Sequence, residues 1–189
     1  MPIKQKLSQH DLSLKHQEWL VKNFDNVEAH TINLDKLFET FESTLSNFDS
    51  ELGMANSRAR IRMTTLYQAA AANKGIVVGT GNKVEDFGVG FYTKYGDGGV
   101  DISPIADCNK SEVWEIGKSI NILKEIIDAA PTDGLWDDGR TDEGQLGLKY
   151  EELEEAMNNV NSINREKYEK IRKMNLHKME PIPVCKIPN

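Results

Sequence analysis

One stretch, residues 75–110, constrains the fold of this chain more than any other part of it. It begins with a short apolar run, Ile76 to Val78, which is bounded by Gly75 and Gly79. A run of this length between glycines is typical of a buried strand in an α/β sheet. The polar residues that follow, Thr80 to Asn82, would then lie at the carboxyl end of that strand. Open α/β sheets bind their ligands at this edge, so the stretch is a candidate binding site.

Charged residues alternate with glycines in the rest of this stretch. Glu85 is expected on the first turn of a short helix, and Lys94, Asp97 and Asp101 follow along a glycine-rich segment. Glycine lets the backbone approach a ligand closely and adopt positive φ. Composition alone leaves two interpretations open, because a Gly/Asp/Lys segment is also typical of a solvated loop.

The order of the residues is more specific than their composition. The words Gly-Thr-Gly-Asn-Lys-Val-Glu and Phe-Tyr-Thr-Lys-Tyr-Gly-Asp-Gly-Gly-Val-Asp resemble the central signature of the NAD synthetase family. The resemblance extends from about residue 52 to about residue 180. It implies an α/β fold, a Rossmann-like parallel sheet with helices on both faces (adenine nucleotide alpha hydrolase-like), in a single domain over residues 1–189.

The resemblance also implies a reaction. Members of the family are ligases of NAD biosynthesis that amidate deamido-NAD with ammonia, using ATP and Mg²⁺. ATP activates the substrate carboxylate as an acyl-adenylate, ammonia displaces AMP, and the products are NAD, AMP and diphosphate. The sequence contains no evident Ser/His/Asp or Cys/His nucleophile arrangement, and this chemistry requires none. We therefore assign no catalytic residue and expect the protein to act by orientation and charge stabilisation.

The resemblance assigns ligands to individual residues. The positions expected to contact ATP are Thr80, Lys110 and Thr132, and the expected magnesium ligand is Glu85. The positions expected to contact deamido-NAD are Arg60, Lys94, Asp101, His177 and Lys178.

Each of these residues also has an ordinary interpretation. Arg60 could be solvated or paired with a nearby acidic residue, and a glutamate such as Glu85 often only compensates the dipole at a helix start. His177 and Lys178 would be unremarkable in a polar tail. Lys110 differs, because a lysine at a helix start is electrostatically unfavourable unless an anion lies beside it.

One family motif is absent from the sequence. The family carries a Ser-Gly-Gly-x-Asp-Ser loop that cradles the ATP pyrophosphate, and this chain contains no Ser-Gly-Gly. We therefore expect a chain that is truncated at its N-terminus, lacking a strand and a phosphate-binding turn. The alternative is a catalytically inactive homologue that dimerises and binds nucleotide weakly. A third possibility, another ATP-pyrophosphatase such as a GMP synthetase or a thiolation enzyme, is disfavoured by the signature words.

The composition excludes several other classes of protein. A formal net charge of −7 argues against a general nucleic-acid binder, which would present a basic face. The two cysteines, Cys108 and Cys185, have no metal-site or disulfide-framework spacing. No apolar run approaches the ~20 residues of a membrane span. We expect no membrane association and a cytoplasmic location.

Hydrophobic periodicity predicts the remaining elements. A helix is expected up to about Asn23, followed by a strand over 27–34. The clearest amphipathic stripe runs from Leu34 to Leu52, and it favours a core or a homodimer interface. Further expected elements are a helix capped by Asn56 and ending at Ala72, a helix capped by Asn109 or Ser111, a short helix over 124–128, a loop over 131–147, two mostly solvated helices over 150–160 and 163–174, and an extended tail over 181–189.

Overall fold

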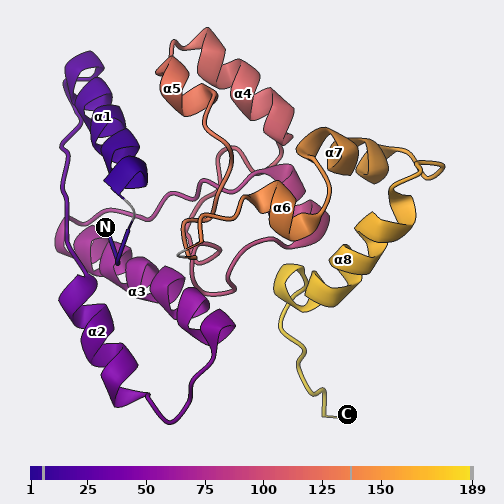
Figure 1. The fold of residues 1–189 in the computed structure, drawn as a ribbon, viewed down its shortest axis with the longest axis horizontal. Coiled ribbons are helices and arrows are strands. Elements are labelled where there is room, and N and C mark those ends of the chain that lie inside the picture. The colour runs from indigo at the N-terminus through magenta and orange to yellow at the C-terminus, as the bar shows by residue number, and fades with distance from the viewer. Residues whose placement is uncertain (6, 137, 188–189) are drawn as a thin grey trace.

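The computed structural model describes residues 1–5, 7–136 and 138–187. Its helices, shown in Figure 1, are α1 (Leu7–Asn23), α2 (Asp35–Thr44), α3 (Glu51–Ala72), the π-helix η1 (Val84–Val89), α4 (Lys110–Ser119), α5 (Lys124–Ile127), α6 (Asp142–Leu146), α7 (Tyr150–Asn158) and α8 (Arg165–Met179). The helices α1, α2 and α3 gather on one side of the molecule, and α7 and α8 gather on the other (Figure 1). The irregular segment over 73–109 runs between the two sides and contains η1.

Each side has its own apolar cluster. Ile3, Leu34 and Phe38 pack together where the N-terminal residues meet α2 and α3. The second cluster joins η1, α6, α7 and α8, and its most buried large side chain is Tyr150. This second cluster fixes η1, which carries Glu85, against the two C-terminal helices.

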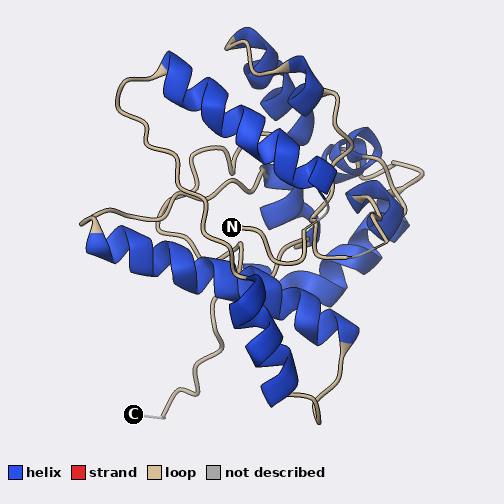
Figure 2. Ribbon diagram, turned by 60° about the vertical axis from the view of Figure 1, so that its left-hand side comes forward, coloured by secondary structure: helices blue, strands red, loops and turns tan. Residues whose placement is uncertain are grey.

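The predicted parallel sheet is present only as a single bridge in the part of the chain that the structure describes. Val78 pairs with Ile102 in a parallel bridge, and Figure 2 shows helices joined by loops without a drawn strand. The Gly79 amide donates to the Ile102 carbonyl at 2.7 Å, and the Asp101 amide donates to the Val77 carbonyl at 2.9 Å. The expected strand at 76–78 is thus an extended segment with one neighbour. The sheet with helices on both faces is not confirmed.

The strand expected over 27–34 is wrong, since these residues, all of them described, form no strand. Leu34 donates its amide to the Pro2 carbonyl at 3.0 Å, which ties the end of the segment to the N-terminus. Most of the other side chains in the segment are exposed. Alternating residues favour a strand only where a neighbouring backbone can pair with it, and here no ladder forms.

The start of α3 differs from expectation in its cap. Ser50 caps the helix, and its hydroxyl accepts a hydrogen bond from the Gly53 amide at 3.1 Å. Gly53 therefore does not interrupt the pattern, and Asn56 lies within the helix rather than capping it. The amide oxygen of Asn56 instead accepts from the Thr93 hydroxyl at 2.6 Å. This contact joins α3 to the glycine-rich segment.

The C-terminal helices have a buried inner face that the sequence did not predict. The α7 and α8 helices bury Tyr150, Leu153 and Tyr168, so the expectation that these helices are mostly solvated is wrong for their inner faces. Helix α8 continues to Met179, so His177 and Lys178 lie in its last turn rather than in a tail. The expected loop over 131–147 contains α6, and its residue 137 lies outside the described part.

Other expectations concern the ends and the cysteines. Asn109 precedes α4 as expected, and its amide donates to the Glu112 carboxylate at 2.7 Å.

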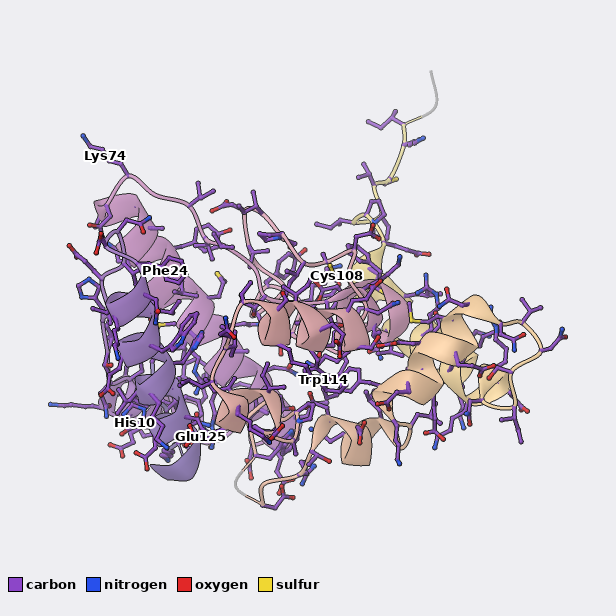
Figure 3. All side chains as sticks on the ribbon, turned by 90° about the horizontal axis from the view of Figure 1, so that it is seen from above. His10, Phe24, Lys74, Cys108, Trp114 and Glu125 are labelled. Carbon is purple, nitrogen blue, oxygen red and sulfur yellow. The ribbon has the colours of Figure 1, made fainter. Side chains whose placement is uncertain are left out.

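Residues 181–187 form an extended, exposed tail, and 188–189 lie outside the described residues. Cys108, marked in Figure 3 beside the start of α4, is a free thiol, and so is Cys185. No helix among the described residues is long and apolar enough to cross a membrane.

Candidate active site

A cavity of about 430 Å³ opens between α3, the extended segment after Ala72, the glycine-rich segment and the loop before α6. Its lining includes Thr80, Asp97, Trp136 and Lys178. The sequence predicted two of these, Thr80 and Lys178, as ligand contacts. Thr80 follows directly after the extended segment that ends at Gly79 and lies in the cavity wall. This is the position expected for a ligand-binding residue at the carboxyl end of a strand.

Four of the residues expected to bind deamido-NAD come together beside this cavity. Arg60 of α3 donates both Nε and Nη2 to the Lys94 carbonyl, each at 3.3 Å. The Lys94 ammonium donates to the His177 carbonyl at 2.5 Å. The Lys178 ammonium donates to the carbonyls of Gly90 and Tyr92, each at 2.9 Å. Three elements that are distant in sequence therefore place their cations in one region.

The fifth of these residues, Asp101, has a different environment. Its carboxylate accepts from the Val77 amide at 2.7 Å and from the Tyr67 hydroxyl at 3.2 Å. Both contacts tie the extended segment to its neighbours, and Asp101 does not line the cavity. Its expected contact with deamido-NAD stays a prediction.

Asp97 lines the cavity and was not among the predicted site residues. Its carboxylate accepts from the Thr93 amide at 3.0 Å. Burial raises the pKa of Asp97 above its usual value, while hydrogen bonds from backbone amides and the charge of Lys178 oppose that shift. Burial also lowers the pKa of the Lys178 ammonium. One feature of the sequence pointed to Asp97, because it lies between the predicted contacts Lys94 and Asp101 on a glycine-rich segment.

Glu85 and Lys110, expected to serve magnesium and ATP, form an ion pair. The Lys110 ammonium is 2.9 Å from the Glu85 carboxylate, and their side chains are 19% and 16% exposed. Asn82 sets the position of Glu85, because its side-chain oxygen accepts from the amides of Val84 and Glu85 at the start of η1. A lysine at a helix start is unfavourable without a nearby anion, and Glu85 is an anion that lies beside Lys110.

Two residues that sequence reasoning missed, Tyr150 and Asp142, lie beside this pair. The Tyr150 hydroxyl lies 2.7 Å from Glu85 Oε1 and 3.0 Å from Asp142 Oδ2. Tyr150 is fully buried and Asp142 is 6% exposed. Burial raises the pKa of Asp142 to about 6, and burial together with the two neighbouring carboxylates raises the pKa of Tyr150. No spacing signal relates Tyr150 to Glu85, because 65 positions separate them.

The region around Glu85 fits a magnesium ion only in part. Among the described residues, no group of three or more His, Cys, Asp or Glu side chains is placed to hold a metal. Lys110 and Tyr150 both contact Glu85 Oε1, and no hydrogen bond or ion pair joins Oε2 to a described residue. Magnesium in nucleotide sites takes one or two carboxylates together with phosphates and water. Glu85 therefore fits the role of a single protein ligand beside a nucleotide.

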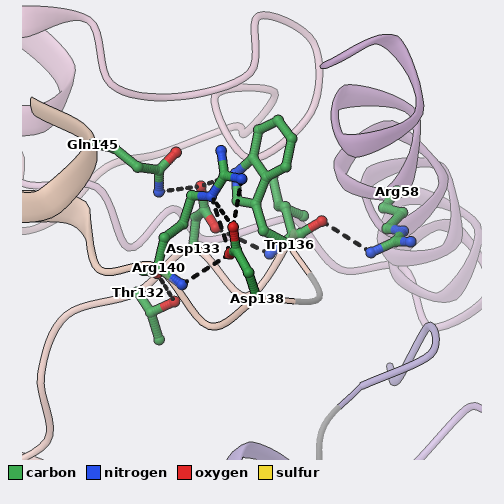
Figure 4. Close-up of polar contacts among 8 residues, drawn as sticks. Arg58, Thr132, Asp133, Trp136, Asp138, Arg140 and Gln145 are labelled. Carbon is green, nitrogen blue, oxygen red and sulfur yellow. Dashed lines mark hydrogen bonds and ion pairs between the residues drawn. The ribbon is translucent and has the colours of Figure 1, made fainter. Parts of the chain in front are cut away.

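Thr132 lies in a loop that forms its own polar network (Figure 4). The Thr132 hydroxyl donates to the Arg140 carbonyl at 3.1 Å and accepts from the Gly134 amide at 3.2 Å. Asp133 accepts from Trp136 Nε1 at 3.2 Å, and the Arg140 guanidinium lies 4.1 Å from the Trp136 ring centre. Thr132 does not line the cavity, so its expected contact with ATP stays a prediction.

Comparison with known proteins identifies relatives of this chain. The family model described as NAD synthase matches residues 1–187. The NH(3)-dependent NAD(+) synthetase of Carboxydothermus hydrogenoformans is 40% identical over 139 residues, which cover 71% of this chain and 56% of the relative. The corresponding protein of Thermoplasma volcanium is 40% identical over 134 residues, 71% of this chain and 54% of the relative. The chain thus spans about half the length of these relatives.

Solved structures give the same result for the fold. The structure of NMN synthetase from Francisella tularensis matches with a TM-score of 0.86 and 32% identity, covering 100% of this chain and 76% of that one. The NH3-dependent NAD synthetase from Campylobacter jejuni matches with a TM-score of 0.63 and 24% identity, covering 85% and 67%. The chain has the fold of these synthetases over its matched length.

Proposed function

Because the chain belongs to the NAD synthase family, a family of ligases, we propose that the protein amidates deamido-NAD with ammonia at the expense of ATP. The reaction would pass through an acyl-adenylate and give NAD, AMP and diphosphate. The observation that carries this proposal is the pairing of Glu85 with Lys110 across two elements at 2.9 Å. This pairing brings a candidate metal ligand beside a candidate ATP contact.

The dinucleotide would be held by the cations that gather near the end of α8. Arg60 can exchange its two bonds to one backbone carbonyl for two bonds to a pyrophosphate or carboxylate, since a guanidinium donates in a planar fork. The ammonium groups of Lys94 and Lys178 belong to the same group, and His177 adjoins it through its backbone carbonyl. Asp101 would fix the extended segment and contact the dinucleotide from it.

ATP would lie on the side of the cavity nearest η1 and α4. Thr80, Lys110 and Thr132 are the proposed contacts, and Glu85 is the proposed ligand of Mg²⁺. When bound, Mg²⁺ neutralises phosphate charge and fixes the nucleotide geometry. Lys110 adds a positive charge near the developing charge of the transition state, in a largely buried position where such charge counts most.

A second candidate function is amidation that yields NMN rather than NAD. It is favoured by the match to NMN synthetase from Francisella tularensis, which covers 100% of this chain. The two functions differ only in whether the nicotinic acid substrate carries an adenylate half. Assays with deamido-NAD and with deamido-NMN, run side by side, distinguish them.

The sequence lacks the Ser-Gly-Gly-x-Asp-Ser loop, so the test of function uses two proteins. One is the 189-residue chain, and the other is this chain joined to the segment of a matched relative that carries that loop. Ammonia-dependent NAD formation is measured for both with ATP and Mg²⁺. We expect turnover from the fusion and none from the chain alone. An inactive homologue would also show no turnover as the chain alone, so the fusion is the protein that distinguishes the two hypotheses. A fusion that binds ATP and yields neither NAD nor NMN would contradict the proposed function.

A further inference from the structure

The two partners of Glu85 use the same carboxylate oxygen. Glu85 Oε1 accepts from Lys110 Nζ at 2.9 Å and from the Tyr150 hydroxyl at 2.7 Å. Glu85 Oε2 makes no hydrogen bond or ion pair with the described residues. A carboxylate held through one oxygen has a fixed orientation and keeps the other oxygen available as a ligand.

We infer that Tyr150 is a positioning residue for Glu85, which holds Oε1 so that Oε2 is free to bind a divalent cation. This inference rests on the proposed function, because it presupposes that Glu85 is the metal ligand. It adds Tyr150 of α7 to a metal site for which the sequence assigned Glu85 alone.

The Tyr150 ring is itself fixed from several directions. Trp114 packs its ring edge-on against it at 6.1 Å between centres, and Lys110 Nζ lies 4.9 Å from the ring centre. The Tyr150 amide donates to the Glu143 carboxylate at 3.1 Å, and the residue is fully buried. Reorienting the hydroxyl would therefore require the surrounding cluster to move, which close packing opposes.

Asp142 lies on the other side of the hydroxyl. Its Oδ2 is 3.0 Å from the Tyr150 oxygen, and its Oδ1 has no hydrogen-bond partner among the described residues although the side chain is buried. The hydroxyl has one hydrogen to donate, and the shorter contact is the one to Glu85. Asp142 is therefore a competing acceptor, and the bond to Glu85 is the one that holds Oε1.

A purely structural role makes a different prediction, and the chain offers a matched control. Tyr168 belongs to the same apolar cluster and is 5% exposed, but its hydroxyl makes no hydrogen bond with the described residues. Tyr150→Phe and Tyr168→Phe each remove one hydroxyl from this cluster. If Tyr150 only supports the fold, the two variants should change cation binding equally.

The test is a titration of the protein with Mn²⁺ alone, followed by the electron paramagnetic resonance signal of the free ion. We expect Tyr150→Phe to raise the Kd for Mn²⁺ by about tenfold or more, as loss of a residue behind a metal ligand does. The Kd for Mn²⁺ of Tyr168→Phe should stay within about twofold of the wild-type value, because the Tyr168 hydroxyl does not support the metal ligand.

Glu85→Gln separates failure of the inference from failure of the proposed function. If Glu85→Gln abolishes Mn²⁺ binding while Tyr150→Phe and Tyr168→Phe have equal effects, the positioning role is wrong and the metal ligand stands. If Glu85→Gln leaves the Kd unchanged, or the wild type binds no Mn²⁺, both the positioning role and the metal assignment are wrong. Thermal unfolding of each variant checks that it is folded during the titration.

Discussion

Glu85 joins three elements of the candidate site, because η1 presents it to Lys110 of α4 and Tyr150 of α7. In the fusion protein, Glu85→Gln should lower kcat for amidation by about 10² to 10³, the usual effect of removing one preorganised electrostatic contact. Glu115→Gln is the matched control, since that side chain is 72% exposed on α4 and its one ion pair with the described residues is to Lys118. Steady-state kinetics with equal losses in both variants would contradict the role of Glu85.

Asp97 makes a separate prediction about pH and stability. Burial raises the pKa of Asp97 in the folded state above 3.8, its usual value and the one expected in the unfolded chain. At pH values between the unfolded-state pKa and the folded-state pKa, the folded chain therefore binds more protons than the unfolded chain. The free energy of unfolding contributed by this group therefore falls as pH rises through that window. Asp97→Asn has no carboxyl to ionise, so it removes this loss of stability with rising pH, and its side-chain oxygen can still accept the hydrogen bond from the Thr93 amide.

Urea unfolding of both proteins at pH 4 and at pH 7 measures this effect. The stability of Asp97→Asn relative to the wild type should increase from pH 4 to pH 7. A stability difference that is the same at both pH values would show that the Asp97 pKa is not raised.

At the residue scale, the sequence predicted what lies close along the chain. The sequence assigned Glu85 to magnesium and Lys110 to ATP, and it indicated that an anion lies beside Lys110, but it did not predict that Glu85 is that anion. Tyr150 and Asp142 could not be predicted, because their contacts depend on how α6 and α7 pack against η1. Local patterns carry no information about such packing.

At the scale of elements, helices were more predictable than strands. Periodicity identified most of the helices, because a helix satisfies its own backbone hydrogen bonds. The segment over 27–34 has alternating residues but no neighbouring backbone to pair with, so alternation predicted a strand that does not form. The extended segment ending at Gly79 has one neighbour in the described residues, the backbone of Asp101 and Ile102, and their pairing stops at a single bridge.

The loop over 131–147 provides the prediction at this scale. Its polar network is largely exposed, and Leu135 and Trp136 are its main apolar contacts with the cavity. We expect its amides before α6 to exchange hydrogen much faster than those of α3, because exposed hydrogen bonds open readily. Hydrogen-exchange mass spectrometry of the protein without ligands measures both segments in one experiment. Equal protection of the loop and of α3 would contradict this expectation.

At the scale of the whole molecule, we predict a homodimer. Large apolar side chains lie exposed around α2 and the start of α3, including Phe48 at 76% and Leu52 at 62%. Phe48→Ser should shift the protein toward monomer in analytical ultracentrifugation. Ile163→Ser, on the opposite side between α7 and α8 and 96% exposed, is the control and should not. A wild-type chain that sediments as a monomer at micromolar concentration would refute the dimer.

The central claim is that this chain carries the dinucleotide side of a NAD synthase site. Calorimetric titration of the chain with deamido-NAD tests it most directly, with Lys178→Ala and the exposed Lys173→Ala on the same helix as a matched pair. We predict saturable binding by the wild type, a Kd raised about tenfold or more in Lys178→Ala, as loss of a charge-assisted contact implies, and little change in Lys173→Ala. No saturable binding by the wild type, or equal binding by the two variants, would contradict the claim.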